Sequence, residues 1–225
     1  MEEKEVSTSV KQYECILYKI LPYSLLFLPI IMGCMISLCS RDEYIRLYFT
    51  SAYFGQSKVH DILWGFTSAS LPLGGCIGTF AATYLGSKIG RKPTTLIFVI
   101  IGILSMGLYF LSYLVNSYVT FFISRFAQGL GSGATMNIGI IFLFESVPEK
   151  RHQICGLLLQ PLINIGILTS SVFSLDIIIE SKWFITAIPT TLLLLVPLLS
   201  LMILPESAIF VHQKYQSENK TKKIL

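Results

Sequence analysis

Long apolar segments follow one another along most of this chain, and they set the first limit on its fold. Six of them are each about 20 residues long, which is the length that crosses a hydrocarbon layer roughly 30 Å thick at about 1.5 Å per residue. They cover Ile16–Cys39, Ile62–Gly86, Thr94–Leu114, Val119–Phe144, Ile154–Leu175 and Trp183–Leu204. Because lipid offers no hydrogen-bond partners to an isolated strand, we expect all six to be helices. The predicted class is an all-α membrane protein.

Composition excludes a soluble globular domain. Only 13% of the residues are charged and 53% are hydrophobic, whereas soluble domains carry roughly 25% charge. The first 15 residues are polar, and the apolar run that follows is too long for a cleavable signal peptide. The expected organisation is a cytoplasmic tail over 1–15, a transmembrane domain over 16–210 and a second cytoplasmic tail over 211–225.

The distribution of basic residues predicts the orientation, because Lys and Arg are enriched in cytoplasmic loops. Of the 17 basic residues, all but five fall on one side of the predicted helices, together with both termini. Arg125 lies inside a span, and the opposite side holds only Arg41, Arg46, Lys58 and Lys182. We therefore expect both termini to be cytoplasmic.

Catalytic, metal and nucleic-acid chemistry find little support in this sequence. The five cysteines have no paired spacing, the three histidines are isolated from one another, and no metal site or cofactor is expected. No predicted span contains a set of acid, base and nucleophile side chains that could perform catalysis, so an enzyme is not expected. The net charge of +4 reflects the basic loops, and no basic face for nucleic acid is present.

Charged residues cluster where predicted helices end on the cytoplasmic side. The clusters are Gly90-Arg91-Lys92, Glu145 to Arg151, and Pro205-Glu206-Ser207. Their signs are complementary, and charges at this depth must reach water or pair with neighbours. The pattern predicts contacts between helix ends on this side.

Glycines are concentrated in the second and fourth apolar segments. Small residues four apart allow two membrane helices to approach closely. Two interpretations remain open, a static packing contact and a seam along which helices slide. The glycines are Gly74, Gly75, Gly78, Gly129, Gly131, Gly133 and Gly139.

A family resemblance rests on an ordered set of short stretches. They are Gly74-Gly75-Cys76-Ile77-Gly78, Gly90-Arg91-Lys92, Arg125-Phe126-Ala127-Gln128-Gly129, Glu145-Ser146-Val147-Pro148, Gly156-Leu157-Leu158-Leu159-Gln160 and Pro205-Glu206-Ser207. Over roughly residues 16 to 210 the chain resembles the N-terminal half of a sugar porter of the major facilitator superfamily, closest to the facilitative glucose transporters. The resemblance implies six helices that form one half (3+3) of a major facilitator bundle. It also implies transport of a hexose by facilitated diffusion with alternating access, in the plasma membrane.

The same resemblance assigns a gating role to the cytoplasmic charges. It implies that Arg91 and Lys92 pair with Glu145 and Glu206, and that Arg151 or His152 fills the other basic place. Such a network could bias two conformations that differ by a few kcal/mol. The alternative is ordinary flanking charge that fixes the topology.

The sugar site that the resemblance implies lies on the fifth segment. Gln160 matches the glutamine that contacts hexose in the family, and its amide offers the donors and acceptor that hydroxyl groups need. Asn164 lies one turn further on the same face, where the family usually has an apolar residue, and Ile163 and Ile167 would contact the sugar ring. For both amides, an interhelical hydrogen bond is the alternative.

Arg125 is a charged residue within the fourth segment, one or two turns from the outer surface. In proton-coupled relatives the matching arginine pairs with an aspartate of the first helix, but here no acid lies between Leu21 and Leu38. The resemblance therefore implies a facilitator without proton coupling. The alternative is a side chain that extends to the outer interface.

A complete facilitator of this family has two six-helix halves, and the sugar lies between them. We expect this chain to be a fragment or half of a full transporter that pairs with a second six-helix half, and not to transport as a monomer. The alternative is a non-transporting binding or regulatory subunit that associates with a full transporter.

Overall fold

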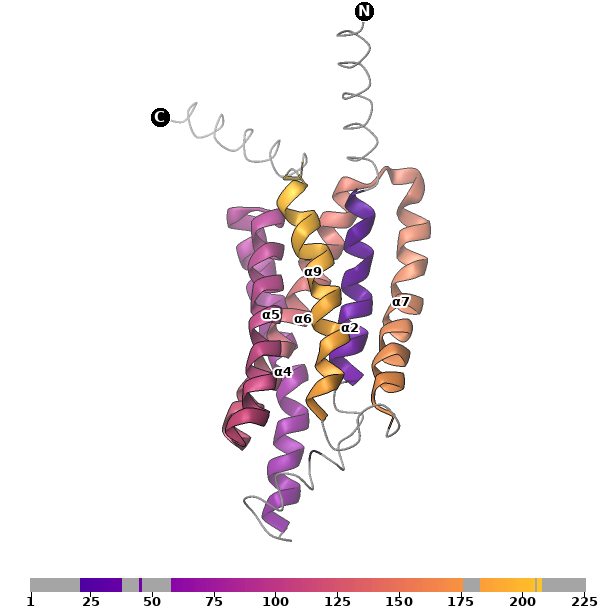
Figure 1. Cartoon of the computed structure of the whole chain (residues 1–225). Helices are drawn as coiled ribbons and strands as arrows, with labels where there is room; N and C mark the ends of the chain where they lie inside the picture. The colour runs from indigo at the N-terminus through magenta and orange to yellow at the C-terminus, as the bar shows by residue number, and fades with distance from the viewer. Residues whose placement is uncertain (1–20, 38–44, 46–57, 176–182, 205, 208–225) are drawn as a thin grey trace, which may run out of the picture.

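The computed structural model describes residues 21–37, 45, 58–175, 183–204 and 206–207, and it contains no strand within them (Figure 1). The described part of the chain begins with a short 3-10 helix, η1, which leads into the first described α-helix. The elements in order are η1 (Leu21–Leu26), α2 (Phe27–Ser37), α4 (Lys58–Ile89), α5 (Arg91–Val115), α6 (Tyr118–Ser146), η3 (Glu149–Arg151), α7 (His152–Phe173), η4 (Trp183–Thr186) and α9 (Ala187–Ile203).

The predicted apolar segments overlap these elements, but their bounds differ. Helices α4, α5 and α6 are longer than the segments predicted for them, whereas α9 (Ala187–Ile203) is shorter than Trp183–Leu204. The segment expected over Ile62–Gly86 is the core of the longer α4 (Lys58–Ile89). The helix continues past the apolar stretch because its hydrogen bonds join backbone groups, which polar residues supply as well as apolar ones. The predicted tails over 1–15 and 211–225, and the start of the first span before Leu21, lie outside the described residues.

Very short junctions force consecutive helices to run antiparallel. Gly90 alone separates α4 from α5, and its φ of 110° is a conformation that only glycine adopts without strain. Asn116 ends α5 in the left-handed region with a φ of 54°. Ser117 then caps α6, since its hydroxyl accepts from the Thr120 N–H at 3.5 Å. The end of α4, the start of α5 and the end of α6, which carry the charged residues, therefore lie at the same end of the bundle.

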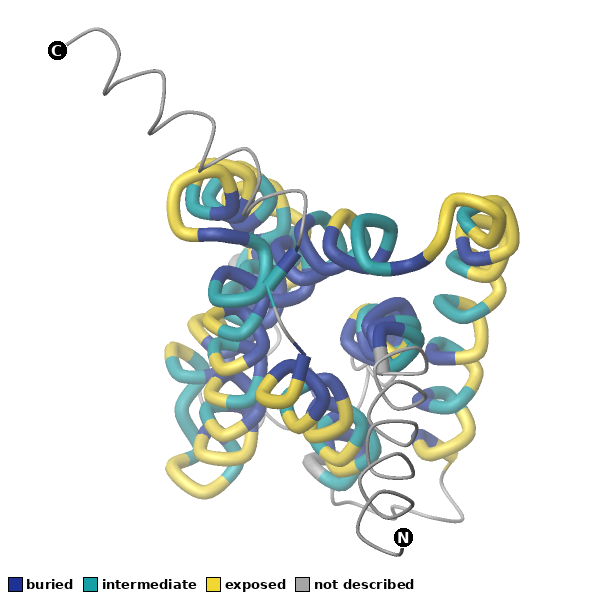
Figure 2. Tube along the Cα trace, turned by 90° about the horizontal axis from the view of Figure 1, so that it is seen from above, coloured by how far each residue is buried: buried dark blue, intermediate teal, exposed yellow. Residues whose placement is uncertain are grey.

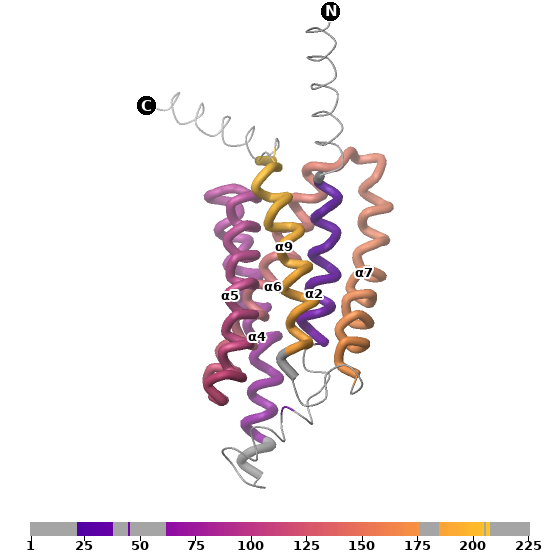
Figure 3. The backbone as a smooth tube through the Cα atoms, viewed as in Figure 1, coloured from indigo at the N-terminus to yellow at the C-terminus, as the bar shows by residue number. Residues whose placement is uncertain are grey.

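Helix α6 lies between α4 and α5, while α7 packs on α2 at the edge of the bundle (Figure 3). Glycines make the close contacts of both pairs. A Cβ on Gly129 of α6 would lie 2.0 Å from the Leu71 carbonyl oxygen of α4, and one on Gly166 of α7 would lie 2.0 Å from the Ile30 carbonyl oxygen of α2. Any side chain at these positions would clash with backbone, so the glycines are close-packing residues in this conformation. The sliding-seam interpretation stays a prediction.

Figure 2 shows that exposed residues lie along the outer sides of the helices, and many of these residues are large and apolar, as lipid contact requires. Phe80 is 74% exposed and Leu157 is 76% exposed, and such a surface would be insoluble in water. Within the described residues, three helical segments are long and apolar enough to cross a membrane and two apolar helices are shorter, so the six spans expected from the sequence are matched only in part. The three are Arg91–Val115, Tyr118–Ser146 and Glu149–Phe173, and the shorter two are Pro22–Ser37 and Ala187–Ile203.

Candidate functional site

Complementary charges meet where α4 and α6 end and α5 begins. The Nε of Arg91 lies 3.2 Å from Oε1 of Glu145, which forms an ion pair between the start of α5 and the end of α6. Nη1 of Arg91 also donates to the Gly86 carbonyl of α4 at 3.2 Å. The two charged side chains are only 16% and 13% exposed. One guanidinium therefore connects the ends of three helices.

Glu206 joins this junction through the backbone of α5. Its Oε1 accepts from the N–H groups of Arg91 at 3.0 Å and Lys92 at 3.1 Å. The first N–H groups of a helix have no partner within the helix, and Gly90 has no side chain that could cap them. A carboxylate at this end also interacts favourably with the helix dipole. Glu206 thus caps α5 from the segment after α9, and we call Arg91, Glu145 and Glu206 the charged junction.

The other basic residues expected here lie elsewhere in the described structure. Arg151 is exposed and donates to the Tyr23 hydroxyl at 3.2 Å. A ring nitrogen of His152 lies 2.8 Å from the Val147 carbonyl oxygen, and the ring packs against Phe144. Neither residue, nor the ammonium of Lys92, forms an ion pair with Glu145 or Glu206 within the described ranges.

The four residues expected to contact sugar lie along α7, but they do not form an enclosed site. Gln160 and Asn164 are exposed, and Ile163 and Ile167 are half-buried. The backbone of the two isoleucines packs against Gly33 of α2, where a Cβ would meet the Ile163 carbonyl oxygen at 2.0 Å. Neither amide has a hydrogen-bond partner among the described residues, so the interhelical bond predicted as the alternative is absent there. The amides are free to meet a ligand on the open side of α7.

Arg125 does not extend to the surface as the alternative interpretation required. Its side chain is 3% exposed, and Nη1 donates to Oε1 of Gln128 at 2.8 Å and to the Met35 carbonyl at 3.4 Å. Nε has no hydrogen-bond partner, and neither does Nε2 of Gln128. Within the described ranges this buried cation contacts only neutral groups.

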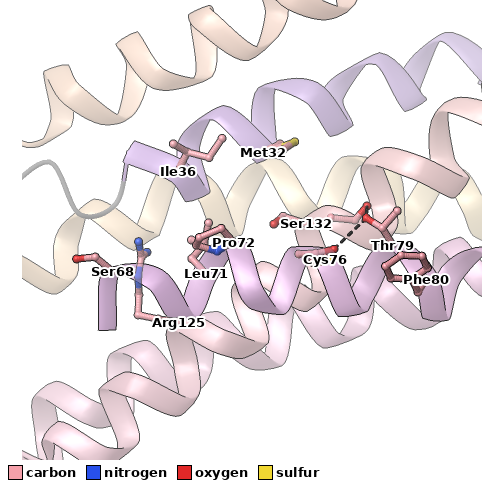
Figure 4. A pocket seen from close by; sticks show the side chains of 12 residues that line it. Met32, Ile36, Ser68, Leu71, Pro72, Cys76, Thr79, Phe80, Arg125 and Ser132 are labelled. Atoms are coloured by element: carbon pink, nitrogen blue, oxygen red, sulfur yellow. Dashed lines mark hydrogen bonds between the residues drawn. The ribbon is translucent and has the colours of Figure 1, made fainter. Parts of the chain in front are cut away.

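An open cavity of about 770 Å³ lies between α2, α4 and α6, and Arg125 is part of its wall (Figure 4). Ser68, Thr79 and Ser132 are its other hydrogen-bonding side chains, and Met32, Ile36 and Leu71 are among its apolar ones. Sequence reasoning did not identify this cavity. A usable signal was present in α4, where Ser68, Pro72, Cys76 and Thr79 recur every three or four residues and so share one helix face.

Comparison with known proteins identifies the family and supports the helical fold. The family model described as sugar (and other) transporter matches residues 9–225. The rat solute carrier family 2, facilitated glucose transporter member 5 is 27% identical over 198 residues, which are 83% of this chain and 39% of the relative. The mouse member 7 is 30% identical over 148 residues, which are 65% of this chain and 29% of the relative. The chain thus spans well under two thirds of the length of these relatives.

Solved structures agree on the fold. A D-xylose–proton symporter superposes with a TM-score of 0.75 at 18% identity, over 90% of this chain and 52% of the symporter. A xylose transporter from E. coli in an inward-open conformation gives a TM-score of 0.74 at 19% identity, over 93% of this chain and 52% of the transporter. With the helical bundle, its apolar surface and a family match over nearly the whole sequence, this integral membrane chain belongs to the sugar (and other) transporter family, whose members are not enzymes.

Proposed function

We propose that this chain forms one six-helix half (3+3) of a major facilitator bundle and takes part in the facilitated diffusion of a small sugar, a hexose, by alternating access. The observation that carries the proposal is the charged junction, in which Arg91 binds both Glu145 and the end of α4. Contacts of this kind hold three helix ends together on one side of a bundle, and their loss would let that side open. Family membership and the likeness to facilitated glucose transporters support the same interpretation.

The exposed face of α7 is the proposed sugar-contacting surface. Gln160 and Asn164 present unbound amide groups there, and sugar hydroxyls need both donors and acceptors. Ile163 and Ile167 supply half-buried apolar surface beside them. A second six-helix half would cover this face and complete the site, because transporters of this type bind substrate at the interface between halves.

Facilitated diffusion is favoured over proton coupling by the surroundings of Arg125. Its partners are the amide of Gln128 and the carbonyl of Met35, so no carboxylate among the described residues stands ready to carry a proton beside it. We place the charged junction, with both termini, on the cytoplasmic side of the plasma membrane, since most Lys and Arg lie at that end.

Hexose binding to the purified chain in lipid nanodiscs tests the proposal. Because this half supplies the Gln160 and Asn164 amides even without the second half, equilibrium dialysis with radiolabelled D-glucose and D-fructose should detect weak saturable binding of at least one sugar. Gln160→Leu should weaken this binding at least tenfold. Gln153→Leu is the matched control, because Gln153 is also exposed and lies two turns earlier on the same face of α7. Absence of binding, or equal effects of the two substitutions, would contradict the proposed sugar surface.

Flux measurements test the need for a second half. The 225-residue chain reconstituted alone in liposomes should give no saturable sugar uptake, because one half offers only an open groove. Saturable uptake by monomeric chain would show that the second half is unnecessary.

A further inference from the structure

The cavity between α2, α4 and α6 contains a positive charge that the proposed sugar surface on α7 does not use. Arginine side chains carry a positive charge, and Arg125 is 3% exposed. A charge buried in a membrane protein is expensive unless it is paired or serves a function. Here the described residues supply two neutral acceptors, the Gln128 amide and the Met35 carbonyl.

The guanidinium still has unused hydrogen-bonding capacity. Arginine has five N–H donors, and the hydrogen bonds of Arg125 all come from Nη1 in the described part of the chain. Its Nε is buried without a partner, as is Nε2 of the neighbouring Gln128. Arg125 is part of the cavity wall, whereas Gln128 is not among the lining residues. A carboxylate in the cavity would meet the guanidinium of Arg125, which matches a carboxylate with two parallel hydrogen bonds.

The rest of the cavity matches the remainder of a small organic acid. Its volume of about 770 Å³ lies within the range of ligand pockets. Most of the wall is apolar, with Met32 and Ile36 on α2 and Leu71 on α4, and Ser68 is another of its lining residues (Figure 4). A carboxylate on an apolar body would place its charge at Arg125 and its carbon skeleton against this wall.

We propose that this cavity binds the carboxylate group of a small organic acid, with Arg125 as its ion-pair partner. The proposal goes beyond sugar transport and does not depend on it, because the cavity lies on the α4 side of α2 whereas Gln160 is on α7. The ligand class follows from the sign of the buried charge and the apolar wall. Benzoate is a suitable probe, and benzamide is its uncharged analogue of nearly the same shape.

Cys76 provides a reporter within the same cavity. It is an exposed free thiol of the cavity wall, whereas Cys34 and Cys155 are buried. Alkylation by N-ethylmaleimide would be followed by mass spectrometry on the full chain in nanodiscs, with Cys15 and Cys39 replaced by serine. Cys76→Ser serves as the background control. Saturating benzoate should slow alkylation of Cys76 at least fivefold, while benzamide should change it less than twofold.

Two substitutions test the role of the charge. Arg125→Gln removes it, and Gln128→Glu supplies a fixed carboxylate at the position that already accepts from Arg125 at 2.8 Å. Both should abolish benzoate protection, and Gln128→Glu decides the question if Arg125→Gln fails to fold. No protection by benzoate, equal protection by benzamide, or undiminished protection in a folded variant would overturn the proposal. D-Glucose and D-fructose form a separate arm, and protection by a hexose but not by benzoate would also overturn it without contradicting the sugar proposal.

Discussion

An arginine side chain has opposite surroundings in the charged junction and in the cavity of Arg125. Arg91 lies at a helix end, is 16% exposed and meets a carboxylate from another helix. Arg125 lies inside a helix, is 3% exposed and meets only neutral acceptors among the described residues. A helix end can gather acids from several segments, because neighbouring ends converge there. A position within the bundle can use only what the adjacent helix faces present, and the described side chains around Arg125 include no acid.

The largest expected effect comes from giving Arg125 the counter-charge it lacks. Gln128→Glu replaces the amide nitrogen, which has no hydrogen-bond partner, with an oxygen and leaves the existing acceptor in place. Since an unpaired buried charge is costly and its pairing recovers part of that cost, we expect a gain of about 2 kcal/mol in unfolding free energy. Denaturation by sodium dodecyl sulfate in mixed micelles would measure it.

Gln128→Leu is the control for that prediction. It removes the best acceptor of Arg125 and should lower stability by about 2 kcal/mol. A loss of stability in Gln128→Glu would show that Arg125 already has a counter-charge and would remove the contrast between the two regions.

Glu206 should be the most sensitive acid of the charged junction. Glu206→Ala exposes the N–H groups of Arg91 and Lys92 that it now caps, and the loss of a helix cap costs about 1–2 kcal/mol. Glu206→Gln keeps an acceptor and should recover about half of that loss. The same denaturation assay applies, and equal effects of the two variants would mean that charge, not capping, is what Glu206 contributes.

The Arg91–Glu145 pair should have a smaller coupling energy. A double-mutant cycle of Arg91→Ala and Glu145→Ala should give about 1 kcal/mol, at the upper end for exposed pairs because both side chains are largely covered. If these residues also gate transport, the coupling should differ between conformations trapped with and without sugar. A coupling energy near zero would instead support the alternative in which Arg91 and Glu145 are ordinary flanking charges that fix the topology.

Lys92 should contribute least. Its backbone N–H is capped by Glu206, but its ammonium forms no ion pair with the acids of the junction in the part of the structure that is described. Lys92→Ala keeps the backbone contact and should change stability by less than about 0.5 kcal/mol. A larger loss would indicate a charge interaction at this end of the bundle beyond the charged junction.

Helix positions could be predicted from local pattern, whereas side-chain partners could not. The segment predicted over Thr94–Leu114 lies within α5, and that over Val119–Phe144 lies within α6. Opposite charges at helix ends also indicated that Arg91 and Glu145 could meet. The family resemblance assigned Arg151 or His152 to the other basic place, but these side chains contact Tyr23 and Val147 instead.

The roles of Glu206 and Arg125 show why pattern alone was insufficient. The family resemblance implied that Glu206 would pair with the side chains of Arg91 and Lys92, yet its carboxylate binds their backbone N–H groups. That outcome depends on how the segment after α9 reaches the start of α5. The sequence excluded an acid in the first helix, but only packing revealed that Arg125 faces a cavity that includes Ser68 and Ile36.

Apolar length and the positions of charges were sufficient to indicate a helical membrane chain and the approximate positions of its helices, because each depends on residues that are neighbours along the chain. The packing of helices distant in sequence decided which cation meets an acid, which amide stays exposed and where a cavity forms. The residues next to a side chain in the sequence do not indicate which helix will lie opposite it. For this reason Gln160 could be proposed from the sequence, while the unpaired charge of Arg125 became visible only in the assembled bundle.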